Sequence, residues 1–375
     1  MNDEEYGTSA LSTLQVDPRP ATKVDLDRAV RDGRRTRRRR NWGTAAAAAT
    51  VVAAVVIGGV TLVQRAGRPQ EKPAPAPAAP ADPTVPTSCT ATALPAGKTK
   101  SVSIVGGEPT GRWYVGTQNP MASRTTGTVI WHDGRLVTEL AGRGEIRMFA
   151  VNSSGIAVGY DALHPVYIRD GVEVTMKGAS QPKAINSSGV VVGEGNPADT
   201  SASFGARWSS PDAEPERLPD IDGRTAEGAY LVADDGLVIG NSADRGALLL
   251  WYPDGRTKAV SMPAGAPMFH PVAYRNGWIY VELLGSGGYR YAPATGVWQQ
   301  LGENATVVPG NSASAHPQVF VGRQPFALPI PPGLPPNAAF DITAMSDDAR
   351  HFGGYTLGIA ADLTFPSGAF TWTCK

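Results

Sequence analysis

The fold is decided by the stretch Ala184-Ile185-Asn186-Ser187-Ser188-Gly189-Val190-Val191-Val192-Gly193. Almost the same phrase occurs at residues 150–159. Two apolar residues precede a polar cluster in which Gly189 can adopt a positive φ. An apolar run that ends in a second glycine follows. This order predicts a strand, a tight turn and a second strand. A chain that reuses one hairpin is predicted to be a repeat protein.

The turn position of this phrase recurs along the sequence. It is found at Gly111, Gly155, Gly189, Gly236 and Gly277, and in less regular form at Pro317 and Ala349. The intervals average about 40 residues, which is the period of a β-propeller blade.

A second phrase follows the first in most units. It is an apolar or aromatic strand that ends in a turn, as in residues 128–134 around Trp131 and residues 249–255 around Trp251. Asp-Gly in such a turn supplies the positive φ of a two-residue hairpin. A further short strand, such as residues 135–138, gives each unit four strands. We therefore expect an all-β fold, a seven-bladed β-propeller, with six blades as the alternative if the unit near Pro317 is irregular.

The two phrases resemble the extracellular bacterial repeats named for their His-Ala-Phe signature. In those repeats an Asn-x-x-Gly-x-Val-Val-Gly hairpin precedes an aliphatic-aromatic-Trp strand. Residues 204–208 and 368–372 take the place of the signature, although its histidine is absent. The resemblance covers most of residues 100–375 and is weakest at 304–338. It implies an extracytoplasmic, membrane-anchored propeller-like domain and says little about activity.

The ends of the repeat region indicate how the ring closes. The last unit stops after its third strand, and residues 91–97 resemble residues 259–265, which end the fourth unit. We expect the N-terminal strand to complete the last blade. The chain's two cysteines, Cys89 and Cys374, then lie on neighbouring strands, and an oxidising exterior permits a disulfide between them. Two unrelated free thiols and an intermolecular bond remain as alternatives.

Residues 44–63 carry no charge and are long enough to cross a bilayer as a helix. Four arginines, Arg37 to Arg40, lie three residues before them, so the positive-inside rule places the N-terminus in the cytoplasm. A cleaved signal peptide is the alternative, although its apolar part is ordinarily shorter.

This span divides the chain into four parts: a basic, largely disordered cytoplasmic leader at 1–43, the transmembrane helix at 44–63, a Pro/Ala-rich extracytoplasmic linker at 64–88 and the propeller at 89–375. The predicted location is the cell membrane, with a single pass and the C-terminal domain outside. The leader holds ten Lys or Arg and seven acidic residues, so the rest of this formally neutral chain is slightly acidic. Nucleic-acid binding by the propeller is therefore not expected.

The residue patterns of familiar catalytic and metal sites are missing from the sequence. None of the five histidines belongs to a His-Glu-x-x-His run, and no Gly-x-Ser-x-Gly occurs. We expect no metal, no cofactor and no enzymatic activity. The alternative is a cell-envelope glycan hydrolase or lyase on a propeller scaffold, which would need paired carboxylates at a cleft.

The expected function is binding or sensing of a protein or a cell-envelope glycan. Turns between strands one and two and between strands three and four lie on one face, so the connections between strands two and three lie on the other. These connections vary most in sequence, and loops on a rigid scaffold commonly carry binding. The candidate ligand-binding residues on them are Asn119, Arg124, Asn196, Asp199, Asp244, Arg245 and Asp362.

Overall fold

The computed structural model describes residues 78–99, 101–118, 126–141, 146–161, 164–178, 180–195, 203–263, 268–283, 287–302, 317–336, 338–357 and 368–375. All of them belong to one compact unit that spans Ala74–Lys375. Among these residues no helix has the length and apolar character needed to span a bilayer. The leader and the expected span at 44–63 lie outside the described residues.

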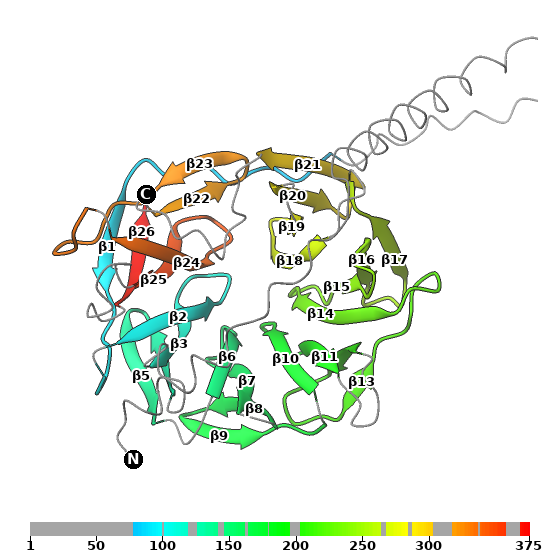
Figure 1. Cartoon of the computed structure of the whole chain (residues 1–375), viewed down its shortest axis with the longest axis horizontal. Coiled ribbons are helices and arrows are strands. Elements are labelled where there is room, and N and C mark those ends of the chain that lie inside the picture. Colours follow the sequence, from blue (N-terminus) through cyan, green and yellow to red (C-terminus); the bar gives the residue numbers. More distant parts are fainter. Residues whose placement is uncertain are drawn as a thin grey trace, which may run out of the picture. The chain divides into compact units, whose positions relative to one another are not determined.

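Antiparallel four-stranded sheets arranged around a central channel make up the unit (Figure 1). Blade one contains β2 (Val102–Gly107), β3 (Trp113–Gln118), β4 (Gly127–His132) and β5 (Arg135–Leu140). Blade two contains β6 (Ile146–Val151), β7 (Ala157–Asp161), β8 (His164–Arg169) and β9 (Val172–Thr175). Blade three contains β10 (Ser180–Ile185), β11 (Val191–Gly195), β12 (Phe204–Trp208) and β13 (Pro215–Arg217).

The remaining blades continue the same order from the channel to the rim. Blade four contains β14 (Ala226–Val232), β15 (Val238–Ser242), β16 (Ala247–Trp251) and β17 (Thr257–Ser261). Blade five contains β18 (Met268–Arg275), β19 (Trp278–Leu283), β20 (Gly287–Ala292) and β21 (Val297–Gly302). The closing blade contains β24 (Ala339–Met345), β25 (His351–Leu357), β26 (Ala369–Cys374) and, at its outer edge, β1 (Cys89–Ala93).

The expectation of seven blades is wrong, and the six-bladed alternative is confirmed. In the described part of the unit near Pro317 there is only a two-stranded sheet, β22 (Gln318–Val321) with β23 (Gln324–Ala327). Val319 and Val321 pack into the closing blade, whereas Phe320 between them packs against blade five. This hairpin therefore fills the outer rim between two blades (Figure 1). On the channel side, Asn276 of blade five donates a hydrogen bond directly to the backbone oxygen of Asp347 in the closing blade.

Every inner strand carries a bulge at the same place. Its register with the second strand shifts between Pro182 and Ala184 in blade three, and equivalent shifts occur in the other five blades. The inner strand lies close to the second strand beside the bulge, so a Cβ at Gly193 would overlap the backbone oxygen of Gln181. The second glycine of the repeated phrase is explained by this close approach. In blade five Val281 takes its place, opposite Pro271.

The asparagine of the phrase organises the turn between the first two strands. Asn186 accepts hydrogen bonds at Oδ1 from the backbone N–H of Val190 and the hydroxyl of Ser188, at 2.9 and 2.8 Å. Its Nδ2 donates to the backbone oxygen of Ala233 in the next blade, and Asn152 donates in the same way to Asn186. One side chain thus shapes its own turn and ties neighbouring blades together.

Apolar side chains fill the spaces between neighbouring blades, and a buried tryptophan on the third strand recurs among them. Each such indole N–H donates to a backbone oxygen on the segment that enters its blade: Trp131 to Pro95, Trp208 to Lys177, Trp251 to Pro219 and Trp372 to Pro329, at 2.8 to 3.1 Å. These bonds satisfy a buried donor while the ring fills the core.

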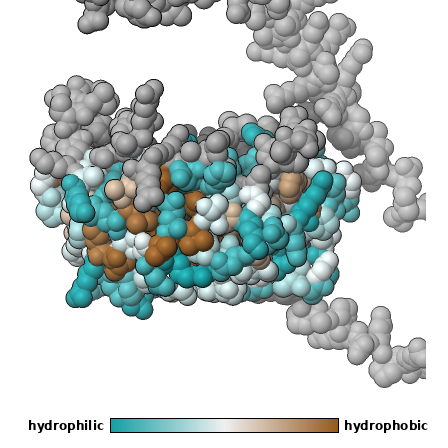
Figure 2. Space-filling view, turned by 90° about the horizontal axis from the view of Figure 1, so that it is seen from below, coloured by the Kyte–Doolittle hydropathy of each residue, from teal (hydrophilic) through white to brown (hydrophobic). Residues whose placement is uncertain are grey.

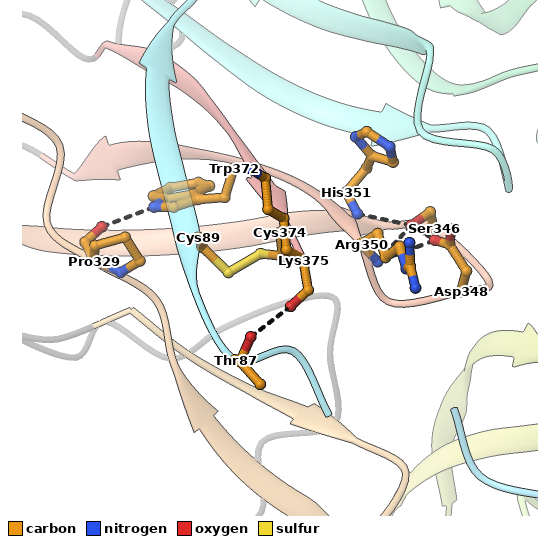
Figure 3. Close-up of a disulfide and its surroundings, with 10 residues drawn as sticks. All are labelled: Thr87, Cys89, Pro329, Ser346, Asp348, Arg350, His351, Trp372, Cys374 and Lys375. Carbon is orange, nitrogen blue, oxygen red and sulfur yellow. Dashed lines mark hydrogen bonds between the residues drawn. A yellow bond between two sulfur atoms is a disulfide. The ribbon is translucent and has the colours of Figure 1, made fainter. Parts of the chain in front are cut away.

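The ring closes as the sequence predicts. Strand β1 pairs with β26 in a register that places Cys89 opposite Cys374, and the two form a disulfide across 285 positions of sequence. Beside the disulfide, the Thr87 hydroxyl donates to the Lys375 backbone oxygen at 3.2 Å (Figure 3). The backbone N–H of Thr87 donates to the same oxygen at 2.8 Å, and Lys375 N donates to Ser88 O at 3.0 Å. The N-terminal strand therefore completes the closing blade.

The described end of the expected linker, residues 78–88, packs against the propeller. Trp278 donates its indole N–H to the backbone oxygen of Pro80 at 3.1 Å. Arg290, which is 1% exposed, pairs with Asp82 and stacks over the Trp278 ring at 4.1 Å. Because Arg290 is buried, Asp82 supplies the counter-charge that its guanidinium needs.

Polar and apolar residues alternate on the outer rim. Among the residues that the structure describes, three exposed valines lie on outer strands, among them Val137 on β5 and Val172 on β9, with exposed fractions of 50% and 59%. Figure 2, which faces the rim at the lower edge of Figure 1, shows apolar surface interrupted by hydrophilic residues. Hydrophilic residues interspersed in this way disfavour pairing of the edge strands with other chains.

Candidate functional site

A cavity of about 950 Å³ occupies the channel at the centre of the ring. Its wall is formed mainly by the inner strands of all six blades. The bulges decide which side chains line it, because the residue at the register shift nearest the turn in each inner strand belongs to the wall: Val105, Phe149, Lys183, Tyr230, Val272 and Thr343. The repeated backbone therefore presents side chains of five different types, one from each blade with valine used twice, at one level.

The cavity has two chemically distinct halves. One extends toward the turns between first and second strands, which we name the turn face. The other extends toward the connections between second and third strands, which we name the loop face. Arg245, in the connection between β15 and β16, lines the loop-face half, whereas Asn152, Asn186 and Asp347 line the turn-face half.

Positive side chains line the loop-face half, with carboxylates behind them. Lys183 lies 3.8 Å from Glu194, and Arg245 makes two hydrogen bonds to Glu227, at 2.6 and 3.0 Å. Lys183 and Arg245 belong to the cavity wall, but neither glutamate does. A ligand in this half therefore meets the two cations first.

Aromatic rings flank these cations. The Phe149 ring lies 4.8 Å from the Lys183 ammonium and 5.8 Å from the ring of Tyr160. Tyr230, from the next blade after Lys183, lies 5.8 Å from the His270 ring. An aromatic face next to a charged donor is typical of pockets that orient a small ligand.

Burial and charge shift the titration of groups in this half. Burial lowers the pKa of Lys183, and Glu194 opposes the shift only partly. Burial also lowers the pKa of His270, and the neighbouring Lys183 and Arg245 lower it further. His270 is therefore neutral at pH 7, when the two cations beside it carry the positive charge.

The turn-face half is acidic. Glu108, Asp234, Asp235 and Asp347 line it, with Arg275 among them. Burial raises the pKa of Asp347, Arg275 opposes this shift, and the charges of Asp234, Asp348 and Glu108 reinforce it. The Nη1 atom of Arg275 is buried and has no hydrogen-bond partner among the described residues. The channel thus runs from a cationic, aromatic half to an acidic half.

Of the seven candidate residues from the loops, two fall in the described part of the chain. Arg245 lines the cavity. Asp244 instead shapes its loop: it accepts hydrogen bonds from Gly246 N at 3.0 Å and from the Ser242 hydroxyl, and pairs with Arg224 at 2.9 Å. The other five, Asn119, Arg124, Asn196, Asp199 and Asp362, lie outside the described residues.

Sequence reasoning missed the channel residues at the bulges. A usable signal was present, because each bulged residue stands three positions before the residue that begins the turn, as Phe149 stands before Asn152 and Lys183 before Asn186. This position varies among the repeats while its flanks stay apolar. No cluster of three or more His, Cys, Asp or Glu suited to a metal ion occurs among the described residues.

No protein-family model matches the chain, and no curated protein matches it. Solved β-propellers are similar to it in fold. Streptogramin B lyase superposes with a TM-score of 0.50 at 11% identity, over 76% of this chain and 97% of that one. Virginiamycin B lyase from Staphylococcus aureus gives 0.48 at 10%, over 77% and 99%, and YCF48 bound to a D1 peptide gives 0.47 at 12%, over 80% and 100%. At these identities the similarity shows the propeller fold alone.

Proposed function

We propose that this protein is a non-catalytic extracytoplasmic binding module of a single-pass membrane protein, which recognises a protein or glycan partner through its loop face. One observation supports this most directly. Arg245, on a loop of that face, lines the same cavity as Phe149, Lys183 and Tyr230 from three inner strands. Loop and channel therefore offer one continuous surface of donors and aromatic rings.

The polar groups of the loop-face half suit binding because hydrogen bonds within the protein fix their positions. Glu227 accepts hydrogen bonds from Arg245 and, at 2.7 Å, from Asn241, while Glu194 accepts one from Ser203 at 2.9 Å. Such contacts hold the cavity wall in one arrangement before a ligand arrives, which lowers the entropic cost of binding.

Two arginines of blade four allow a matched test. Arg245 pairs with Glu227 at the cavity, and Arg256 pairs with Asp254 at 2.6 Å in an exposed turn away from it. The full-length chain and its R245A and R256A variants are applied to arrays of cell-envelope glycans and surface-protein peptides. We expect R245A to weaken the selected interaction about tenfold and R256A to leave it unchanged. Equal effects of both variants, or no selected ligand at all, would contradict the proposal.

A second candidate is a glycan hydrolase or lyase, and Asp347 is the observation that favours it. A carboxyl group with a raised pKa inside a cavity, next to a second acid, has the character of a general acid. Turnover of a panel of cell-wall glycans by the full-length chain, abolished in D347N, would establish this function. Absence of turnover, or turnover that survives D347N, would exclude Asp347 from such a role.

The membrane anchor is part of the proposal and rests on the uncharged run at 44–63 and the arginines before it. Protease treatment of intact cells that express the full-length chain tests it. Digestion of the propeller with protection of an epitope placed at residue 1 supports the proposed topology, and protection of both contradicts it.

A further inference from the structure

We propose that the ligand of the loop-face half is an acidic glycan, in which a sugar carboxylate binds Lys183 and the sugar ring stacks on the neighbouring aromatic side chains. This inference rests on the proposed function, because it names the chemical class that the binding site takes.

The ammonium group of Lys183 has unused hydrogen-bonding capacity. Among the described residues its Nζ donates one hydrogen bond, to Gln181 Oε1 at 3.0 Å. Glu194 lies 3.8 Å away, outside hydrogen-bond distance, and the side chain is 19% exposed. An ammonium has three donors, so Lys183 can still donate to a ligand in the cavity. Burial lowers the pKa of this ammonium, and a bound anion would oppose that shift.

The charge of the wall selects an anion. Lys183 and Arg245 line the loop-face half, whereas the compensating Glu194 and Glu227 lie outside the wall. A carboxylate placed against Lys183 therefore approaches cations more closely than it approaches the glutamates. The acids that line the cavity lie in the turn-face half, so they orient the anionic end of a ligand toward the loop face.

The rings at the same level suit a sugar. Phe149 and Tyr230 occupy bulge positions on the blades that flank Lys183, and both line the cavity. The C–H face of a pyranose packs on such rings, while its hydroxyl groups bond to polar side chains at the rim. A uronic acid combines this face with a carboxylate in one small unit.

The backbone of the inner strands disfavours an extended peptide as the occupant. Strand addition requires a regular free edge along which a peptide can pair. Each inner strand instead bulges at the level of Lys183, which interrupts the edge and blocks such pairing.

Two ligands that differ only in their carboxylate groups test whether the carboxylate contributes to binding. Binding of trigalacturonic acid to the full-length chain is compared by calorimetry with binding of its fully methyl-esterified form, which keeps the rings and removes the charges. Glucuronic acid with glucose, and N-acetylmuramic acid with N-acetylglucosamine, extend the comparison. We expect the acids to bind about tenfold more tightly than their neutral counterparts.

Lysine variants then test whether Lys183 is responsible for the preference for acidic sugars. K183M retains the apolar stem without the charge and should reduce the preference for the acids to within about twofold, whereas K183R should retain it. K258M is the matched control, because Lys258 also lies over an aromatic ring, that of Tyr291, but on an outer strand. It should bind both forms as the unaltered chain does.

The results separate this inference from the proposed function. Equal binding of acidic and neutral sugars would overturn the inference while leaving a glycan-binding module. A preference that persists in K183M would also overturn it. If an acidic peptide binds and no sugar does, the binding function stands and the glycan assignment fails. If nothing on the arrays or in calorimetry binds, both fail.

Discussion

Asn276 donates a hydrogen bond from Nδ2 to the backbone oxygen of Asp347, which lies 71 residues further along the chain. The backbone N–H of Asp347 in turn donates to Pro109 O at 2.8 Å. Turns from blade five, the closing blade and blade one are thereby joined in sequence around the channel. The number of blades at the channel follows from this contact, because it leaves the β22–β23 hairpin at the rim.

The Asn276 side chain should contribute to stability through this bond. Asn276 has a φ of 49°, so N276G removes the hydrogen bond without backbone strain, whereas N276A adds strain at positive φ. We expect N276G to lower the free energy of unfolding by about 1 kcal/mol and N276A to lower it by about 2 kcal/mol. Chemical denaturation measures both, and an N276G variant as stable as the unaltered chain would show that the bond contributes nothing.

The disulfide between Cys89 and Cys374 should be the largest single covalent contribution to stability. It closes a loop of 285 residues, for which the loop-entropy model gives roughly 5 kcal/mol. C89S, C374S and the double variant should lose about the same amount, because each removes the same bond. Non-reducing peptide mass spectrometry checks the linkage. A single variant that matches the oxidised chain in thermal unfolding would contradict the prediction.

Strong local patterns made the hairpins and the ring closure predictable. The Asn-Ser-Ser-Gly cluster specifies its turn through hydrogen bonds within four residues, so residues 186–190 suffice to reveal it. Closure was predictable because residues 91–97 resemble the outer strand of blade four, and the two cysteines gave a second, independent indication.

The blade count and the channel wall depend on contacts between distant segments. Val319-Phe320-Val321-Gly322 resembles the apolar run that ends the repeated phrase, but the structure uses it as a rim hairpin that packs on two different blades. The local sequence does not distinguish a blade strand from a rim hairpin. Likewise, a bulge changes which residue faces the channel, so alternation along β10 alone does not place Lys183 in the cavity wall.

The close approach of the first two strands of a blade predicts that replacing the second glycine of the repeated phrase lowers stability. In G193A the new methyl group would collide with the backbone oxygen of Gln181, so we expect a loss of about 3 kcal/mol in the free energy of unfolding. Gly134 is the control: its φ is 75°, but nothing lies within 4 Å of an added Cβ, so G134A should cost only about 1 kcal/mol of backbone strain. Equal losses would show that the bulged strand moves aside freely.

Acid should destabilise the propeller through His270. Burial, Lys183 and Arg245 lower the pKa of this imidazole in the folded chain, and Glu227 opposes them only in part. The unfolded chain, in which the pKa is about 6.5, therefore binds a proton more readily than the folded chain does. Stability is fully present above that pH and falls as the pH drops from about 6.5 toward the lower folded value. The neutral variant H270Q should lose less stability than the unaltered chain between pH 8 and pH 5. Denaturant unfolding across this range measures the difference, and parallel curves for the two chains would show that His270 does not carry this dependence.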